Sequence, residues 1–150
     1  GGEMTETKAK YGNAPHIWRA RIDGQVVPAL RARVVRLKNG NSHSYTPEKY
    51  ANWKSLVTYE LLQQSPPMFA GPVRVQLFFY LPRPKSCPKA RKYPTARNDV
   101  DNLAKAIMDG INATGKIWLD DSQVCDLQVT KEYADESNHA GVNVAVWELR

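Results

Sequence analysis

The sequence is poor in cysteine and has no long apolar run. Its 150 residues contain two cysteines, Cys87 and Cys125, which are too few and too far apart for a disulfide framework or a paired-cysteine metal site. This scarcity favours a reducing, cytoplasmic compartment. No apolar run approaches the roughly 20 residues that cross a bilayer, and the N-terminus lacks the layout of a signal peptide. The sequence therefore excludes small disulfide-rich secreted proteins and predicts a protein without a membrane partner.

Several motifs of common enzyme classes are also missing. The sequence has no glycine-rich dinucleotide motif, no phosphate-binding loop and no internal repeat. The three histidines, His16, His43 and His139, are scattered, so each fits a surface or packing role better than a metal ligand. No Ser-His-Asp or Cys-His arrangement is visible.

Length and charge indicate one domain with an anionic partner. A chain of 150 residues with 42% hydrophobic composition can bury a core of its own. We expect a polar leader over residues 1–14, excluded from the fold, and a single domain over residues 15–150. The 21 Lys and Arg exceed the 15 Asp and Glu, an imbalance that favours nucleic acid or a phosphorylated surface as partner.

The charges are divided unevenly along the chain. Residues 1–98 hold 17 basic and 5 acidic side chains, whereas residues 99–150 hold 4 basic and 10 acidic ones. An acidic cluster surrounded by basic residues is expected of a site that binds cations next to a bound polyanion. The alternative is an uneven surface charge without function.

The hydrophobic periodicity predicts alternating strands and helices. Alternation over residues 17–22 indicates a strand before the Asp23-Gly24 turn, and residues 26–37 indicate an extended or edge segment that the Asn39-Gly40-Asn41 turn closes. Thr46-Pro47 begins a helix that stops before Ser65-Pro66-Pro67. Further elements are expected as strands over residues 73–81, 123–132 and 141–149 and a helix over 101–113, which Gly115 ends. The fold class predicted is α/β (α+β), a single compact domain with a mixed β-sheet flanked by two main helices.

Residues 82–98 form a proline-rich basic segment. They contain four prolines, six basic residues and no acidic residue, a composition that predicts an exposed loop. The loop is either a solvated linker or a segment that binds phosphates. The candidates for phosphate binding, here and in the segment before the first helix, are Arg31, Arg33, Arg83, Lys85, Lys89, Arg91, Lys92 and Arg97.

Four carboxylates occur in two short clusters. Asp99 and Asp101 lie at the start of the second helix, and Asp120 and Asp121 follow an apolar stretch about twenty residues later. Four gathered carboxylates would repel one another unless a cation offset them, and oxygen ligands without a His or Cys cluster favour Mg²⁺ or Mn²⁺. Alternatively, Asp101 caps the helix and pairs with Lys105, its i,i+4 neighbour on the face opposite the core.

The sequences D-V-D-N-L-A-K-A-I-M-D (99–109) and W-L-D-D-S-Q-V (118–124) resemble the RusA family of Holliday-junction resolvases. The resemblance implies a RusA-like fold and a bacterial or phage-encoded homodimer. It also implies paired symmetric Mg²⁺-dependent nicks in four-way DNA junctions during recombination and repair. By resemblance, Asp99, Asp101 and Asp121 match the catalytic acids that hold the metal, Asp120 stands beside them in the same pair, and Lys105 matches the active-site lysine.

Two other functions stay open. One is a non-catalytic basic DNA-binding module in which the aspartates only cap a helix and pair with lysines. The other is a nuclease with broader selectivity for flaps or other branched DNA, because shape selection depends on loops. A nucleotide-sugar transferase that uses a DxD motif fits poorly with the short chain and its basic charge.

Overall fold

The computed structural model describes residues 16–29, 34–36, 42–44, 47–96 and 99–150, with the backbone alone for 34–36, 42–44 and 47. Several features singled out in the sequence lie outside the described residues: the leader 1–14, Arg31, Arg33, Arg97, the Asn39-Gly40-Asn41 turn and Thr46.

Four strands form one mixed sheet in the order β1-β6-β4-β5. Strand β1 (Ile17–Asp23) pairs antiparallel with β6 (Gly141–Glu148), β6 pairs antiparallel with β4 (Val73–Leu81), and β4 pairs parallel with β5 (Val124–Tyr133). These four strands confirm the alternating and β-branched segments identified in the sequence. The apolar run of β4 is typical of a strand with neighbours on both sides.

The segment between β1 and the first helix differs from the prediction. Residues 25–29 are neither helix nor strand, so the edge strand that was one alternative for residues 26–37 does not begin at residue 26. The described strands here are short: β2 (Val34–Arg36) pairs antiparallel with β3 (Ser42–Ser44). Pro28 lacks the N–H that a continuous ladder would need, and β3 carries no apolar alternation by which it could be predicted.

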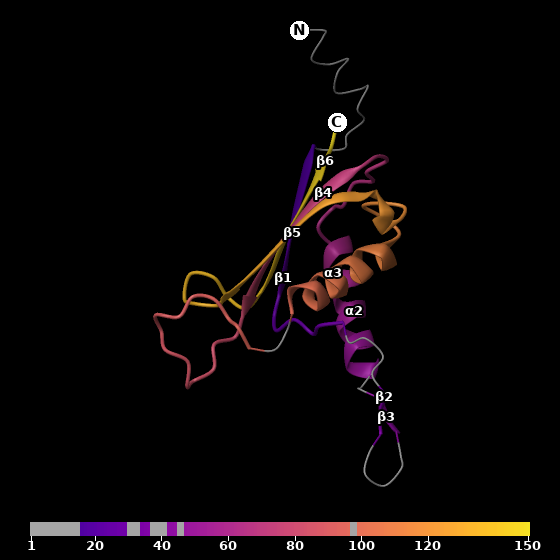
Figure 1. The fold of residues 1–150 in the computed structure, drawn as a ribbon. Coiled ribbons are helices and arrows are strands. Elements are labelled where there is room, and N and C mark those ends of the chain that lie inside the picture. Colours follow the sequence, from indigo (N-terminus) through magenta and orange to yellow (C-terminus); the bar gives the residue numbers. More distant parts are fainter. Residues whose placement is uncertain (1–15, 30–33, 37–41, 45–46, 97–98) are drawn as a thin grey trace.

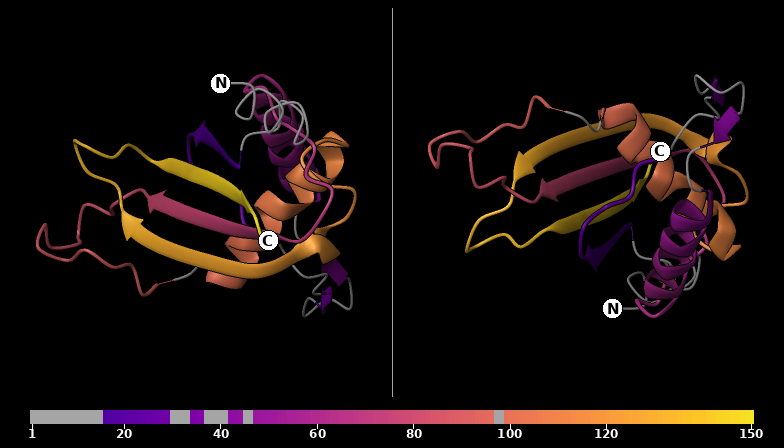
Figure 2. Two further views of the ribbon diagram at one scale, coloured as in Figure 1. Left: turned by 90° about the horizontal axis from the view of Figure 1, so that it is seen from above. Right: turned by 90° about the horizontal axis from the view of Figure 1, so that it is seen from below.

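Two helices cover one face of the sheet, as Figures 1 and 2 show. Helix α2 spans Pro47–Leu62 and helix α3 spans Val100–Thr114, confirming both predicted helices. Gly115 ends α3 with a left-handed φ of 64°, which glycine adopts without steric cost. Within the described ranges, no helix is long and apolar enough to span a membrane.

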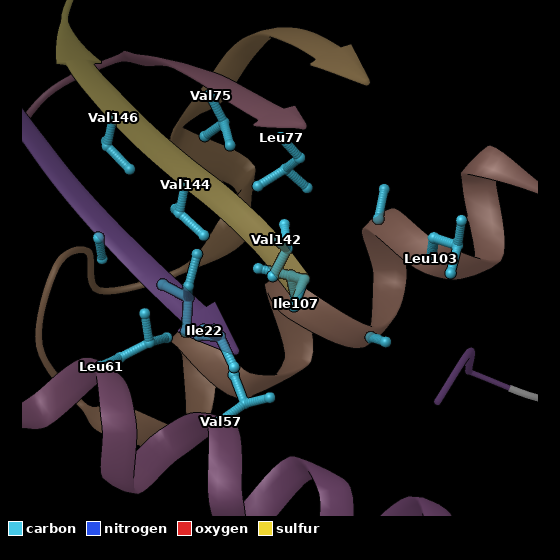
Figure 3. Packing of buried hydrophobic residues seen from close by; sticks show 14 of the residues in the cluster. Ile22, Val57, Leu61, Val75, Leu77, Leu103, Ile107, Val142, Val144 and Val146 are labelled. Atoms are coloured by element: carbon cyan, nitrogen blue, oxygen red, sulfur yellow. The ribbon is translucent and has the colours of Figure 1, made fainter. Parts of the chain in front are cut away.

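The core lies between this helical layer and the sheet (Figure 3). The inward side chains of β4 and β6, such as Leu77 and Val144, meet apolar residues of both helices, such as Val57 and Ile107. The buried residues of helix α3 recur at the 3.6-residue period of a helix and form one face: Leu103, Ala104, Ala106, Ile107, Gly110 and Ile111. The domain is therefore a mixed α+β fold, and no helix of the described residues lies on the opposite face of the sheet.

The two helices approach closely at Gly110. A Cβ atom added there would lie 2.5 Å from Val57 Cγ1, closer than packed carbon atoms tolerate. The glycine thus lets α3 lie against α2. Because α3 leads from the 82–98 segment toward β5, this contact helps fix which side chains α3 presents outward.

Candidate active site

The first acidic cluster lies at the N-terminal end of α3. Asp99 occupies the N-cap position with an extended backbone, and its side chain accepts no capping hydrogen bond. Asp101 lies in the first turn and is exposed. The N-cap is therefore Asp99, not Asp101 as the sequence suggested. A carboxylate in the first turn still interacts favourably with the positive end of the helix dipole.

The second cluster is held by the buried residues that precede it. Ile117 is fully buried at a positive φ of 74°, a conformation that costs a β-branched residue energy. Its backbone N–H donates to Pro67 O at 2.9 Å and its carbonyl accepts from Phe69 N at 2.7 Å. Trp118 is buried as well. The chain is thus fixed immediately before Leu119, whose side chain is 82% exposed, and before the two aspartates.

Asp120 and Asp121 have different environments although they are adjacent. Asp120 is the N-cap of a 3₁₀ turn, η1 (Asp121–Gln123), and its carboxylate accepts from the Ser122 backbone N–H at 3.1 Å. Hydrogen bonds from the side chain and backbone of Ser122 lower the pKa of Asp120. Gln123 completes the capping box by accepting from the Asp120 backbone N–H.

Asp121 is oriented by a chain of side-chain hydrogen bonds from α3. Trp118 Nε1 donates to Asn112 Oδ1 at 2.6 Å, and Asn112 Nδ2 donates to Asp121 Oδ2 at 3.1 Å. The buried indole thereby fixes the amide, and the amide fixes the carboxylate. Asn112 is therefore a positioning residue, a role that no sequence motif indicated.

A groove of about 590 Å³ lies between α3 and β5 and joins the two clusters. Asp101, Lys105 and Asp109 line it from α3, and Asp121 lines it from η1. Its apolar lining comes from both elements: Val100, Ala104 and Met108 of the helix, and Leu127 and Val129 of the strand. The structure thus brings Asp101, Lys105 and Asp121 to one surface, whereas Asp99 and Asp120 do not line it.

Lys105 is paired with the carboxylate one turn further along the helix. Its Nζ lies 3.2 and 3.1 Å from the two carboxylate oxygens of Asp109. Tyr50 of α2 donates its hydroxyl to Asp109 Oδ2 at 2.6 Å. Burial and this carboxylate raise the pKa of Tyr50, so the phenol stays a neutral donor. Sequence reasoning missed Asp109 and Tyr50. The i,i+4 spacing from Lys105 could have indicated Asp109, whereas Tyr50 reaches it only through helix packing.

The groove offers oxygen ligands but no complete cage for a cation. Among the residues that the structure describes, no three His, Cys, Asp or Glu side chains lie close enough together to hold a metal ion. Mg²⁺ commonly uses one or two protein carboxylates and completes its shell with water and substrate phosphates. Asp101 and Asp121 are therefore a fitting donor pair for this ion, and the hard oxygen donors exclude a typical zinc site.

The basic loop is ordered against the end of β5 over residues 82–96. Arg83 lies over the Tyr133 ring at 4.8 Å and donates to Pro88 O at 2.6 Å. Lys92 pairs with Glu132 at 3.1 Å, and its backbone carbonyl accepts from Tyr133 N. Two of the five described candidates for phosphate binding are therefore anchored.

The other three described candidates, Lys85, Lys89 and Arg91, are exposed and form no ion pair with described residues. Figure 2 shows that the loop extends beyond the sheet. It then leads through residues 97–98 to Asp99, the residue before α3.

Comparison with known proteins agrees with the motifs at the groove. Residues 23–146 match the family described as Endodeoxyribonuclease RusA. A Bacillus subtilis (strain 168) protein, described as "Uncharacterized protein YqaN", is 35% identical over 111 residues, which cover 67% of this chain and 77% of that protein. The family match spans both acidic clusters, both helices and the strands β4 and β5. The chain belongs to the RusA family of endodeoxyribonucleases.

Proposed function

We propose that the protein is a Mg²⁺-dependent, structure-selective endodeoxyribonuclease that resolves Holliday junctions by paired symmetric nicks in DNA recombination and repair. The observation that carries the proposal is the groove itself. Asp101 and Asp121, twenty residues apart in the chain, line it together with Lys105. A basic loop precedes this groove in the chain, and the family acts on DNA.

Asp101 and Asp121 would hold the ion from the two sides of the groove. When bound, Mg²⁺ activates water for attack on the scissile phosphate and offsets the charge that develops there. Mn²⁺ is expected to substitute for Mg²⁺. Asp99 remains a predicted ligand from the family resemblance. Within the adjacent pair we assign the metal role to Asp121 and the capping role to Asp120, because the Asp120 carboxylate already accepts the Ser122 N–H.

Lys105 would supply a fixed positive charge next to the phosphate. The Asp109 carboxylate, itself held by the Tyr50 hydroxyl, restrains the ammonium group. A restrained cation needs little reorganisation when charge develops in the transition state. In this role Lys105 contacts substrate, and Asp109 and Tyr50 are positioning residues.

Asn112→Ala is expected to weaken metal binding about 10- to 100-fold, the range typical for the loss of a partner that orients a metal ligand. The substitution removes the donor that holds Asp121 Oδ2. Titration with Mn²⁺ followed by electron paramagnetic resonance gives the affinity without relying on cleavage. Asn102→Ala, on the same helix and outside the groove lining, is the control. Unchanged Mn²⁺ affinity in Asn112→Ala would contradict the positioning role.

The basic loop is expected to provide phosphate contacts. Replacing Lys85, Lys89 and Arg91 together by Gln should lower the slope of log Kd against log salt by about 3, because each phosphate contact contributes about 0.9. Binding of a four-way junction over a range of NaCl concentrations measures this slope. Lys49→Gln, an exposed lysine of α2, serves as the control, and an unchanged slope in the triple variant would leave the loop a solvated linker. Arg31, Arg33, Arg83, Lys92 and Arg97 remain candidates of the same kind.

A homodimer is proposed because one protomer with one groove cannot make two opposed cuts, whereas a twofold dimer presents two grooves to a junction. On a cruciform plasmid, paired cuts give linear DNA and single cuts give nicked circles. When wild type is mixed with an equal amount of Asp101→Asn and the subunits exchange, about one quarter of the dimers have two wild-type subunits. Linear product should therefore fall to about one quarter of that from the same total amount of wild type, and nicked circles should increase. If linear product falls only in proportion to the wild-type dose and nicked circles do not increase, the protein does not cut as a dimer.

The function is tested by cleavage of three labelled substrates of matched sequence: a four-way junction, a flap and a linear duplex. We expect symmetric nicks in the junction that require Mg²⁺ and disappear with EDTA. Equal cleavage of the flap would replace junction resolution by a broader branched-DNA nuclease. Tight binding without cleavage under Mg²⁺ or Mn²⁺ would favour the non-catalytic DNA-binding module.

A further inference from the structure

The face of the sheet opposite the helices carries a second hollow, remote from the acidic groove in the fold. The strand register places Arg19, Ala145 and Gln76 in one row across β1, β6 and β4. The next row contains Asn143 and Phe78. Helices α2 and α3 lie on the other face (Figure 1), so these side chains stand on the face that neither of these helices covers.

The hollow measures about 500 Å³, within the range of sites for small organic groups. Ala145 lies between the longer side chains of Arg19 and Gln76 in its row. Because its side chain is a single methyl group, the space above β6 stays open. Phe78 and Tyr80 line one side, with their ring centroids 4.9 Å apart and their planes inclined by 32°. The hollow is thus a polar recess with an aromatic wall.

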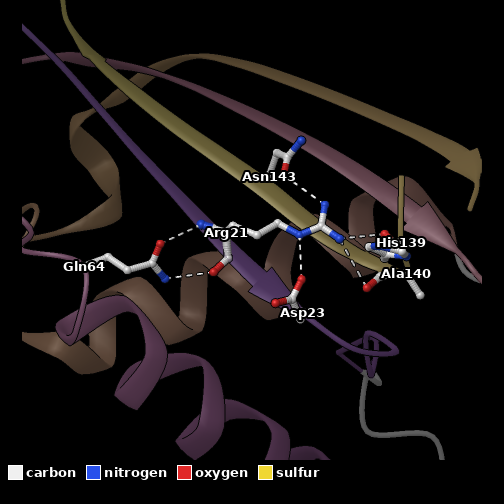
Figure 4. Close-up of polar contacts among 6 residues, drawn as sticks. All are labelled: Arg21, Asp23, Gln64, His139, Ala140 and Asn143. Atoms are coloured by element: carbon white, nitrogen blue, oxygen red, sulfur yellow. Dashed lines mark hydrogen bonds and ion pairs between the residues drawn. The ribbon is translucent and has the colours of Figure 1, made fainter. Parts of the chain in front are cut away.

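One side of the hollow is rigid. Arg21 donates from Nε to Asp23, from Nη1 to Asn143 and from Nη2 to the carbonyls of His139 and Ala140, as Figure 4 shows. Its guanidinium also lies 5.6 Å from the centre of the Tyr80 ring.

Gln64, which follows α2, joins the hollow to that helix. Its side chain accepts from the Arg21 N–H at 2.9 Å and donates to the Arg21 carbonyl at 2.8 Å. These bonds preorganise the wall, and ligand binding does not need to order it.

Other polar groups in the hollow are uncommitted. Arg19 is exposed and makes no ion pair with described residues, and the Gln76 amide makes no hydrogen bond to them. Asn143 uses its oxygen for Arg21, which leaves its amide N–H groups for a ligand. One cation, two amides and an aromatic wall remain for a ligand with an anionic group, hydrogen-bonding edges and a flat ring.

We propose that this hollow binds an unpaired nucleotide of a DNA strand, with the base against Phe78, its edge toward Gln76 and Asn143, and its phosphate on Arg19. Aromatic side chains beside a cation are the usual means by which proteins hold single strands. The inference rests on the proposed function, because an enzyme that acts on branched DNA works at a branch point, where strands can unpair. It adds a site for an unpaired strand on the side of the sheet away from the cleavage groove.

Photocrosslinking tests the proposal with the full chain in EDTA. The probe is a single-stranded oligothymidylate in which one base is 5-iododeoxyuridine. We expect the crosslinked peptide to contain Phe78 or Tyr80. Ala145→Leu, which fills the hollow and keeps the base off Phe78, should reduce crosslinking at this peptide at least about fivefold, the lower range for loss of one base–aromatic contact. Arg19→Ala, which removes the cation, should reduce it as well. Gln128→Leu is the matched control, because Gln128 lies on the same face and outside the hollow.

The outcomes separate this inference from the proposed function. Ala145→Leu should still cleave a fully paired four-way junction at the wild-type rate, because Ala145 is no part of the acidic groove. Junction cleavage without a crosslink at Phe78 or Tyr80 would overturn the inference and leave the nuclease intact. A crosslink that both hollow variants lose, in a protein that cuts no branched DNA, would keep the nucleotide site and overturn the nuclease. Equal crosslinking in Ala145→Leu and Arg19→Ala would overturn the site even if the peptide is found.

Discussion

Asp101→Asn is expected to reduce junction cleavage by at least about 100-fold while junction binding stays within a few-fold of wild type. Asparagine keeps the size and one oxygen of the side chain but removes the charge that would hold the cation. Loss of one group that stabilises transition-state charge typically costs 10²- to 10³-fold in rate, so about 100-fold is the lower bound. Asp121→Asn should behave alike, because both carboxylates line the groove. Single-turnover cleavage with separate binding measurements distinguishes a lost chemical step from lost affinity.

The neighbouring Asp120 supplies the control for this prediction. Its carboxylate caps η1, and asparagine is as good an N-cap as aspartate. Asp120→Asn should therefore retain both the fold and most of the cleavage activity. If Asp120→Asn loses cleavage as fully as Asp121→Asn, the two adjacent carboxylates share the metal role, and the division of roles proposed here is wrong.

Gly110→Ala is expected to lower the free energy of unfolding by about 1 to 3 kcal/mol, the usual cost of overpacking. In an open helix the same change would stabilise the protein by up to about 1 kcal/mol. Here the added methyl group would lie 2.5 Å from Val57 Cγ1, and Val57 is fully buried. Equilibrium urea unfolding measures the difference, with the denaturant slope compared between variants.

Val57→Ala tests the cause of that destabilisation. In the Gly110→Ala background it removes the methyl group that the new Cβ meets. The double variant should therefore lose less free energy of unfolding than the two single variants lose in sum, by about 0.5 to 3 kcal/mol. Gly71→Ala is the control, since nothing lies within 4 Å of a Cβ added there. Strict additivity, or a Gly110→Ala variant as stable as wild type, would contradict the close contact of α2 and α3.

The regular elements of the fold could be predicted because their signals are local. Alternation along β1 and the β-branched run of β4 have period two, and α3 shows its buried face at period 3.6. Gly115 marks the end of α3 because the left-handed backbone there favours glycine. The short hairpin β2–β3 lacks such a pattern and depends on pairing between segments.

The candidate site could be predicted only in part. The acidic residues were evident from composition, and the helix period placed Asp101 and Lys105 on the outer face. The division between Asp120 and Asp121 depends on the capping box of a 3₁₀ turn three residues long, and the link from Asp121 to Trp118 depends on the geometry of the turn at Ile117. The contact of Tyr50 with Asp109 arises from the packing of two helices distant in sequence. Tertiary contacts of this kind leave no periodic signal.

The metal site in the groove is tested most directly by Mn²⁺ binding to the protein, measured by electron paramagnetic resonance with a four-way junction present in a non-cleavable form. Asp101 and Asp121 would hold the ion together, so we expect binding by wild type and Asp120→Asn and a large loss of affinity in both Asp101→Asn and Asp121→Asn. Absence of Mn²⁺ binding in the wild-type complex, or binding that survives both substitutions, would contradict the assignment of this groove as the metal site.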